Sequence, residues 1–274
     1  MKQPMQRLHA RPGRKPSTDT KDDPESMRKI QGKVLQKVRS AGTANTADAV
    51  PAPDLERDVC EMLDVIAAGG IAIIPTDLTY AIVGHRGEAV RRIFAAKNRS
   101  FNKPCGMFGS WQLSREIHDA PAERHEMVRT LVEEEGLPFS IVAPFRATHP
   151  LLTAMDPDVI RNSSLAGTMD MVINGGHWVK ELARQSKARN LAVFGSSANR
   201  SLSGSKYRLE DIEPEVLEVA EVAYDYGLSR YADPKGLSST IIDLADFSVV
   251  RVGHRFDEIV VAMQRRFQVT LRSA

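Results

Sequence analysis

A continuous apolar run at residues 71–74 constrains the fold more than any other feature of the chain. It follows the paired glycines Gly69 and Gly70 and ends at Pro75. One amphipathic helix pattern precedes it from Asp54 onward, and a second one follows at residues 88–97. A strand that is apolar at every position is typical of a sheet covered by helices on both faces. The run therefore predicts a buried strand in an α/β fold.

The rest of the chain alternates strand and helix patterns in the same way. Further strands are predicted at 105–108, 138–145, 168–173, 191–197, 222–226, 240–244 and 249–252. Further helices are predicted at 121–135, 178–187, 209–219 and 256–267, and the segment up to residue 166 is predicted to be irregular. Because the last strands lie too close together for helical crossovers, we expect a sheet with both parallel and antiparallel pairs.

Composition divides the chain into three parts. Residues 1–53 are rich in Pro, Ser, Thr, Lys and Asp, which predicts a disordered basic extension and linker. Residues 54–267 are predicted to form one globular domain, followed by a tail at 268–274. The first 50 residues carry 11 Lys and Arg against 5 Asp and Glu, whereas the remainder carries 26 against 30. The extension either binds RNA, with residues 26–40 forming a basic helix, or is a solvated tail.

Several classes of protein do not fit this sequence. No apolar run approaches the roughly 20 residues of a membrane span, and the first residues lack the apolar core of a signal peptide. Two distant cysteines, Cys60 and Cys105, favour a cytoplasmic protein without a disulfide framework or membrane contact. The common glycine-rich nucleotide-binding motifs and spaced zinc ligands are missing, and no histidine has a nucleophile nearby. The sequence therefore supports no hydrolase triad, and it assigns neither a catalytic residue nor a protein-bound metal.

Polar residues gather where the predicted strands end. The clusters are Thr76, Asp77 and Tyr80; Lys97, Arg99 and Lys103; Ser196, Ser197, Asn199 and Gly204; Ser238, Ser239 and Thr240; and Arg251 with Gly253. Ligands bind at strand ends in open α/β sheets, and cations, hydroxyls and glycine backbone together suit a triphosphate. Each cluster alone also fits a structural role, as favourable charge at a helix end or as a turn.

In this order, the clusters resemble the motifs of the YrdC-like family, whose best-known members are threonylcarbamoyl-AMP synthases. The matching segments are PTDLTYAI from Pro75, Lys97-Asn98-Arg99 with Lys103-Pro104, Ser197-Ala198-Asn199 with Ser203-Gly204, STIID from Ser239, and Arg251-Val252-Gly253. The resemblance covers about residues 54–265. It implies a single YrdC-like domain with a twisted mixed parallel and antiparallel sheet, flanking helices and a concave basic pocket.

The resemblance also implies a reaction and a set of site residues. Synthases of the family condense threonine, bicarbonate and ATP into threonylcarbamoyl-AMP, release pyrophosphate, and so supply a tRNA modification. By this resemblance, the nucleotide and its phosphates would be bound by Lys97, Arg99, Lys103, Ser197, Asn199, Ser239 and Arg251. Thr76 and Tyr80 would line the amino-acid site, and Mg²⁺ would bridge the phosphates of ATP. The expected partners are ATP and small-molecule substrates, together with tRNA or double-stranded RNA.

Three positions depart from the family pattern. Leu78 replaces a threonine, Ala81 replaces a glycine and could crowd the ligand, and Val172 replaces an arginine, with Asp170 nearby. Loss of a forked cation weakens a carboxylate or phosphate site unless another side chain, such as Arg146 or Arg161, compensates. Two functions therefore stay open. The favoured one is a nucleotidyltransferase of the threonylcarbamoyl-AMP synthase type, and the alternative is a non-catalytic protein that binds double-stranded RNA.

Overall fold

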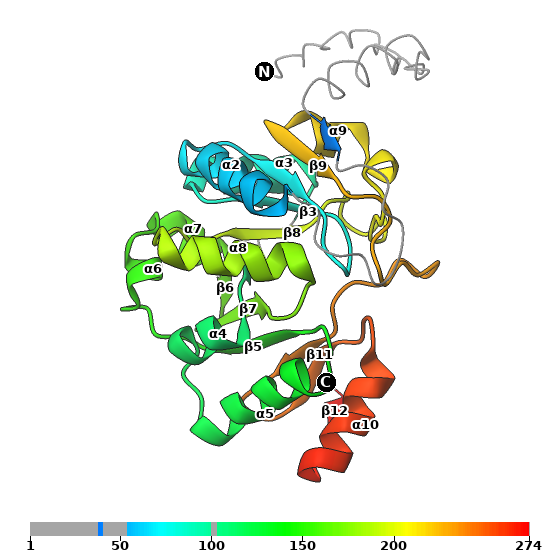
Figure 1. Ribbon diagram of the computed structural model, residues 1–274. Coiled ribbons are helices and arrows are strands. Elements are labelled where there is room, and N and C mark those ends of the chain that lie inside the picture. The colour runs from blue at the N-terminus through cyan, green and yellow to red at the C-terminus, as the bar shows by residue number, and fades with distance from the viewer. Residues whose placement is uncertain (1–37, 41–53, 100–102, 274) are drawn as a thin grey trace, which may run out of the picture.

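One mixed sheet of twelve strands runs through the part of the chain that the computed structural model describes, residues 38–40, 54–99 and 103–273 (Figure 1). Its order is β1-β9-β2-β3-β8-β4-β7-β5-β10-β11-β12, and β6 pairs with β7 beside this path. The strands are β1 Val38–Ser40, β2 Ala72–Ile74, β3 Ala81–Gly84, β4 Gly106–Phe108, β5 Ser140–Pro144, β6 Ser164–Leu165, β7 Thr168–Val172, β8 Phe194–Ser197, β9 Val222–Asp225, β10 Ile241–Asp243, β11 Ser248–Arg251 and β12 Arg272–Ser273. The sheet contains parallel pairs such as β2–β9 and antiparallel pairs such as β3–β8, which confirms the predicted mixed sheet.

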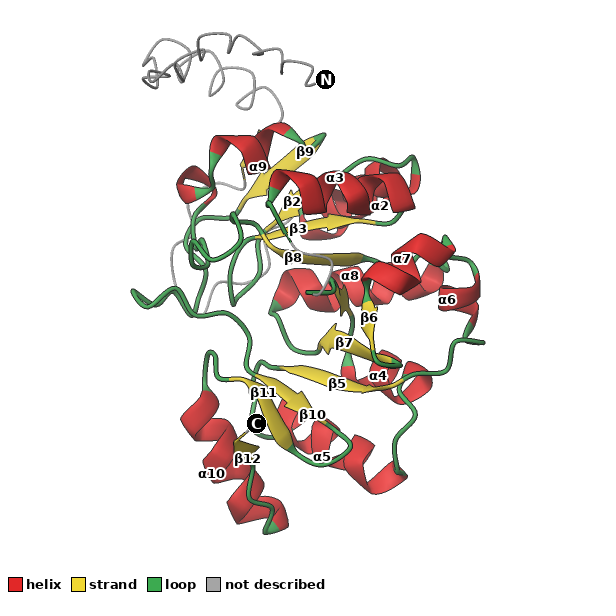
Figure 2. Ribbon diagram, turned by 180° about the vertical axis from the view of Figure 1, so that it is seen from behind, coloured by secondary structure: helices red, strands yellow, loops and turns green. Residues whose placement is uncertain are grey.

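Helices flank this sheet along its whole length (Figure 2). They are α2 Leu55–Ala67, α3 Gly87–Ala96, α4 Trp111–Ile117, α5 Ala122–Glu133, α6 Pro150–Thr153, α7 Pro157–Asn162, α8 His177–Ala188, the 3₁₀ turn η1 Leu209–Asp211, α9 Pro214–Glu218 and α10 Phe256–Phe267. None of the helices within the described ranges is long and apolar enough to cross a membrane.

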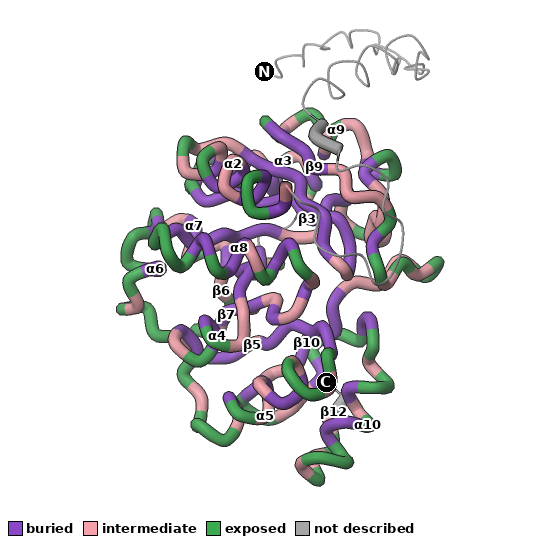
Figure 3. Tube along the Cα trace, viewed as in Figure 1, coloured by how far each residue is buried: buried purple, intermediate pink, exposed green. Residues whose placement is uncertain are grey.

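The apolar run at residues 71–74 forms β2, and both of its faces are covered, as predicted. Ala72 and Ile74 pack in one cluster with residues of α2 and α8. Ile71 and Ile73 point the other way and pack with residues of α3 and α9. All four residues of the run are 0% exposed, and Figure 3 shows the neighbouring β3 in the colour of buried residues. Burial on both faces is the physical reason that no polar residue interrupts the run.

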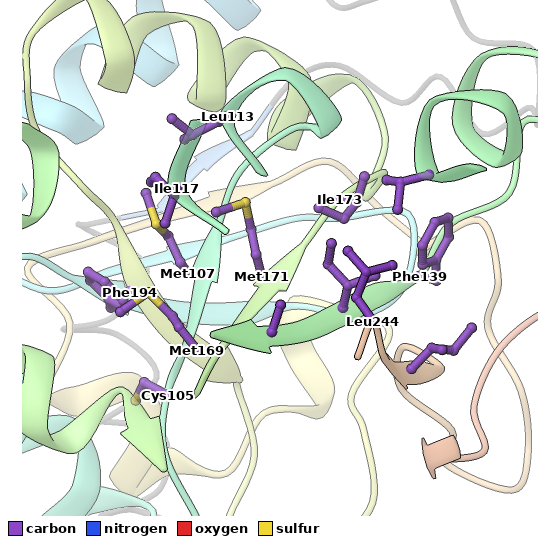
Figure 4. Packing of buried hydrophobic residues seen from close by; sticks show 14 of the residues in the cluster. Cys105, Met107, Leu113, Ile117, Phe139, Met169, Met171, Ile173, Phe194 and Leu244 are labelled. Atoms are coloured by element: carbon purple, nitrogen blue, oxygen red, sulfur yellow. The ribbon is translucent and has the colours of Figure 1, made fainter. Parts of the chain in front are cut away.

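A third apolar cluster fills the other half of the molecule (Figure 4). Met107 of β4 and Met169 and Met171 of β7 lie in it together with Leu113 and Ile117 of α4. Methionine side chains are unbranched and flexible, so they fill the irregular spaces between strands and short helices.

The structure places a strand, β3, where the sequence analysis expected only a polar turn before the next helix. Ala81–Gly84 pairs with β2 in an antiparallel hairpin, with Ile73 opposite Ile82. The segment is short and its residues belong to the conspicuous polar motif, so its strand character was not recognised. Residues 75–80 are therefore the loop of a hairpin.

Two other predictions needed correction. The helix predicted at 209–219 is broken into η1 and α9, since Pro214 has no N–H to donate and Glu213 before it is extended. The segment before residue 166 holds the short helices α6 and α7, both of which begin with proline at their amino ends.

Most of the predicted extension, residues 1–53, lies outside the described residues. Within it the structure describes only Val38–Ser40, which pair in parallel with β9 as strand β1. This differs from the basic helix considered for residues 26–40, because the free edge of β9 offers backbone partners that a local pattern cannot show. The predicted boundaries of the domain and of its tail stay predictions.

Candidate functional site

One hairpin, the pairing of its second strand with β8 and one long connection bring the predicted site residues toward one another. The loop at 75–80 lies at the junction of β2 and β3, and Ala81 pairs with Ser197 at the end of β8. The connection from β9 to β10 crosses between the two halves of the sheet (Figure 1). On its way, the backbone N–H of Tyr231 donates to the carbonyl of Asp77 over 2.9 Å. The 75–80 loop is thus joined by a hydrogen bond to the connection between β9 and β10, and β3 directly after the loop pairs with the end of β8.

Lys97 ends helix α3 and is almost completely buried, with 1% of its surface exposed. Its Nζ donates hydrogen bonds to the carbonyl oxygens of Ser197 and Asn199, and its own carbonyl accepts from the N–H of Ser201. Within the described residues no carboxylate pairs with it. Burial lowers the pKa of Lys97 to about 7, and the charge of Arg99 lowers it further. In its protonated form the side chain has three N–H donors, so one is not used by these two carbonyls.

Arg99 joins the two ends of the loop that follows α3. Its Nε donates to the carbonyl of Lys103 and its Nη2 to the carbonyl of Pro104, each over 2.7 Å. Burial lowers the pKa of Arg99, and the neighbouring Cys105 and Asp170 oppose that effect. The Lys103 side chain is exposed and forms no hydrogen bond or ion pair in the part of the chain described here. The predicted cationic cluster thus consists of two enclosed cations and one exposed cation.

The end of β8 wraps around Lys97. Ser197 is half-buried and Asn199 is buried, and the Asn199 side chain donates to the carbonyl of Arg200. The Asn199 Oδ1 and the Oγ atoms of Ser196 and Ser201 are buried without a hydrogen-bond partner among the described residues. Buried polar atoms are seldom left unbonded, so this strand end offers unused hydrogen-bonding groups to a ligand.

The second half of the site is built around Ser239. Its Oγ accepts from Arg251 Nη2 over 2.7 Å and from Ser140 Oγ over 2.9 Å, and its carbonyl accepts from Arg251 Nε over 2.9 Å. Enclosure of the guanidinium lowers the pKa of Arg251, although the residue as a whole is exposed. Ser140, which the sequence analysis missed, is fully buried in β5. Its signal was a hydroxyl in the middle of an apolar strand, PFSIVAPF.

Asp170 lies between the half of the site around Arg99 and the half around Arg251. It was not among the predicted site residues. It lies on β7 against Gly106 of β4, where a Cβ at position 106 would come within 2.7 Å of Asp170 Oδ2. Burial raises the pKa of Asp170 to about 6, while Arg251 and then Arg99 lower it. Its Oδ1 is buried with no hydrogen-bond partner in the described part of the chain. Lys97, Arg99, Asp170 and Arg251 therefore form one electrostatically linked cluster, which we call the cation cluster.

The hydroxyls of Thr76 and Tyr80 are engaged within the protein. Thr76 Oγ1 donates to the carbonyl of Thr79 over 2.6 Å and accepts from two N–H groups of its own loop. The Tyr80 side chain is fully buried, and its OH donates to the carbonyl of Gly227 over 2.8 Å and accepts from Tyr226 N–H over 3.1 Å. Both residues shape the loop. The prediction that they line an amino-acid site stays a prediction.

The positions that depart from the family pattern are apolar inside the fold. Leu78 is 3% exposed and Ala81 is 2% exposed, and Ala81 packs in the cluster under α2 and α8 instead of facing outward. The two arginines considered as compensation bond elsewhere. Arg146 donates to the carbonyls at the end of α4 and to Asp119, and the exposed Arg161 pairs with Asp158. Neither arginine has a partner in the cation cluster among the described residues.

No group of three or more metal-ligating side chains lies together in the described ranges. A metal at the cation cluster would therefore take most of its ligands from a bound molecule, and the carboxylate of Asp170 lies within the cluster.

Comparison with known proteins places the chain in a family. The Sua5/YciO/YrdC family model, described as telomere recombination, matches residues 64–253. No curated protein sequence matches the chain. P. abyssi Sua5 in complex with L-threonine is 19% identical with a TM-score of 0.61, and the match covers 86% of this chain and 62% of that chain. The chain thus spans less than two thirds of that protein.

Two smaller proteins share the fold over most of their length. A hypothetical protein from Streptococcus mutans is 18% identical with a TM-score of 0.62, over 87% of this chain and 98% of that one. E. coli YciO is 15% identical with a TM-score of 0.54, over 79% of this chain and 94% of that one. The fold agrees with the predicted architecture, and the chain belongs to the Sua5/YciO/YrdC family.

Proposed function

We propose that the cation cluster binds the phosphates of ATP and that the chain is a threonylcarbamoyl-AMP synthase. The observation that carries this proposal is that Lys97 and Arg99, at the end of α3, share one electrostatic cluster with Arg251 of β11, which comes from a distant part of the chain. All three retain N–H donors beyond those used within the protein. Ser197, Asn199 and Ser239 supply hydroxyl and amide groups beside them.

The chemistry asks for charge neutralisation rather than a protein nucleophile. Bicarbonate and the amine of threonine combine to a carbamate with loss of water, and a carbamate oxygen then attacks the α-phosphorus of ATP. The bond to the β-phosphate breaks and pyrophosphate leaves. Fixed guanidinium groups stabilise the charge that builds up on the phosphates and hold the reacting atoms in line, and a bound phosphate favours the protonated form of Lys97, which then does the same. This suits a site with several enclosed cations and no catalytic triad.

The amino-acid end of the reaction is supported by the family alone. P. abyssi Sua5 has been captured with L-threonine, and this chain shares its fold. Leu78 and Val172 stand where the family pattern has a threonine and an arginine, so the hydrogen-bonding groups around the amino acid differ here. Mg²⁺ would accompany the nucleotide, with Asp170 beside it, and would supply further neutralisation of the phosphates.

The proposal predicts pyrophosphate release that requires ATP, bicarbonate and threonine together. Release should fall to background when any one is omitted, and the adenylate should appear in equal amount by mass spectrometry. Replacing threonine by serine or valine in the same assay measures how strongly the altered amino-acid end selects its substrate.

Absence of product would count against the synthase, and RNA binding would then be measured. Salt-sensitive binding of duplex RNA that is lost on deletion of residues 1–37, which leaves β1 in place, would favour the non-catalytic RNA-binding protein.

A further inference from the structure

The carboxylate of Asp170 is the feature of the cation cluster that nucleotide binding alone does not explain. It stands among Arg99 and Arg251, yet neither guanidinium bonds to it within the described residues. Arg99 donates to the carbonyls of Lys103 and Pro104, and Arg251 donates to Ser238 and Ser239. Asp170 Oδ1 is left buried and unbonded.

Such an arrangement costs stability. Burial of an ionised carboxylate oxygen without a hydrogen bond is unfavourable. The neighbouring strand makes room for this carboxylate, because Gly106 has no side chain where a Cβ would contact Asp170 Oδ2. A carboxylate that is accommodated but left without partners is characteristic of a binding site.

The carboxylate also conflicts with a bare phosphate. Arg99 and Arg251 both lower the pKa of Asp170 and so lie within electrostatic range of it. An anion held by these two arginines would therefore be repelled by Asp170 at neutral pH. A divalent cation between the carboxylate and the phosphates removes the repulsion, and Mg²⁺ is commonly held by one or two carboxylates together with substrate phosphates.

We propose that Asp170 is a protein ligand of a divalent cation shared with the nucleotide phosphates that Arg99 and Arg251 bind. The inference rests on the proposed nucleotide site and adds to it a metal ligand at a position within the β7 strand. A single carboxylate cannot hold Mg²⁺ alone, so the cation binds only together with the nucleotide. In the described ranges no group of three or more acidic, histidine or cysteine side chains lies together to hold a metal without a bound ligand.

The test is calorimetric titration of the full chain with ATP, in Mg²⁺ and in EDTA, for the wild type and Asp170→Asn. Coupling between two ligands is commonly about 5- to 150-fold, and it is reciprocal. We expect Mg²⁺ to raise the ATP affinity of the wild type at least about tenfold. In Asp170→Asn this effect should shrink to about threefold or less, while the affinity in EDTA stays equal or rises because a negative charge is gone. Asp246→Asn, which alters an exposed turn carboxylate bonded to Ser248 N–H, should behave as the wild type.

A second measurement does not depend on the variant's affinity. With Mn²⁺ in place of Mg²⁺, the electron paramagnetic resonance spectrum of the protein–ATP complex should differ between the wild type and Asp170→Asn at saturating nucleotide. Identical spectra, or an undiminished Mg²⁺ effect in Asp170→Asn, would overturn the metal role and leave the nucleotide site standing. A third outcome is possible, in which Mg²⁺ affects Asp170→Asn as much as the wild type but only the wild type binds ATP more tightly toward pH 6. That result would show that Asp170 is protonated in the complex and does not bind a metal. If the wild type binds no ATP in either medium, the proposed function fails and the metal site with it.

Discussion

Replacing Lys97 with methionine is expected to remove a strong pH dependence from the stability of the protein. Burial lowers the pKa of Lys97 from 10.5 to about 7 in the folded state. Between these values the unfolded chain holds the proton and the folded chain does not, so wild-type stability rises with pH. The slope from this group is about 1.4 kcal/mol per pH unit, or roughly 3 kcal/mol between pH 7 and pH 9. Methionine has no such proton.

Urea unfolding of both proteins at pH 6, 7, 8 and 9 measures the effect. The difference in the free energy of unfolding, wild type minus variant, should be constant below about pH 7 and should grow above it. The substitution also leaves the carbonyls of Ser197 and Asn199 without their donor. This loss lowers the free energy of unfolding of the variant equally at every pH and so does not change its pH dependence. Lys180→Met, at an exposed position of α8, should run parallel to the wild type. If the free energies of unfolding of Lys97→Met and the wild type changed with pH in parallel, Lys97 would not be held in an enclosed environment.

Replacing Gly195 with alanine is expected to destabilise the protein by at least about 3 kcal/mol. Gly195 lies in β8 between β3 and β4, and a Cβ there would come within 2.1 Å of the carbonyl oxygen of Ile82. That oxygen belongs to a paired strand, so relief requires separation of β3 and β8. The same movement would shift Ser197 and Asn199 and disturb the carbonyls that surround Lys97.

Gly136→Ala is the matched control for this substitution. Gly136 has a positive φ of 64°, but no atom lies within 4 Å of a Cβ built there. Its replacement should cost only about 1 to 2 kcal/mol, from the left-handed backbone alone. Chemical unfolding of both variants tests the difference, and equal midpoints would contradict the close approach of β8 to β3.

Sequence patterns predicted the elements whose burial is regular. The strand at 71–74 could be predicted because every residue in it is covered, and α2, α3 and α10 because each buries one stripe of its surface. Strand β3 was missed because four residues carry too little periodicity to separate a strand from a turn. The helix expected at 209–219 failed at Pro214, where a local backbone constraint outweighed the pattern.

The site residues also divide into those that a local sequence pattern predicts and those that only the pairing of distant strands brings together. Lys97 and Arg99 were recognised from a cluster of cations at a helix end, which is local in sequence. Ser140 and Asp170 become neighbours of Ser239 and Arg251 only because β7, β5 and β10 are adjacent in the sheet. Pairing of strands distant in sequence leaves no local trace. Thr76 and Tyr80 belong to a local motif of the family and were easy to find. In the structure their hydroxyls form hydrogen bonds that shape the loop itself.

Titration of ATP with Mg²⁺ into the wild type, Lys97→Ala and Arg99→Ala tests the central claim most directly. Hydrogen bonds to charged groups contribute about 1.5 to 3 kcal/mol, so each substitution should weaken ATP binding about 10- to 100-fold. Arg161→Ala, which removes an exposed arginine paired with Asp158, should leave the affinity unchanged. Unchanged affinity in Lys97→Ala or Arg99→Ala, or no ATP binding by the wild type, would contradict the phosphate site.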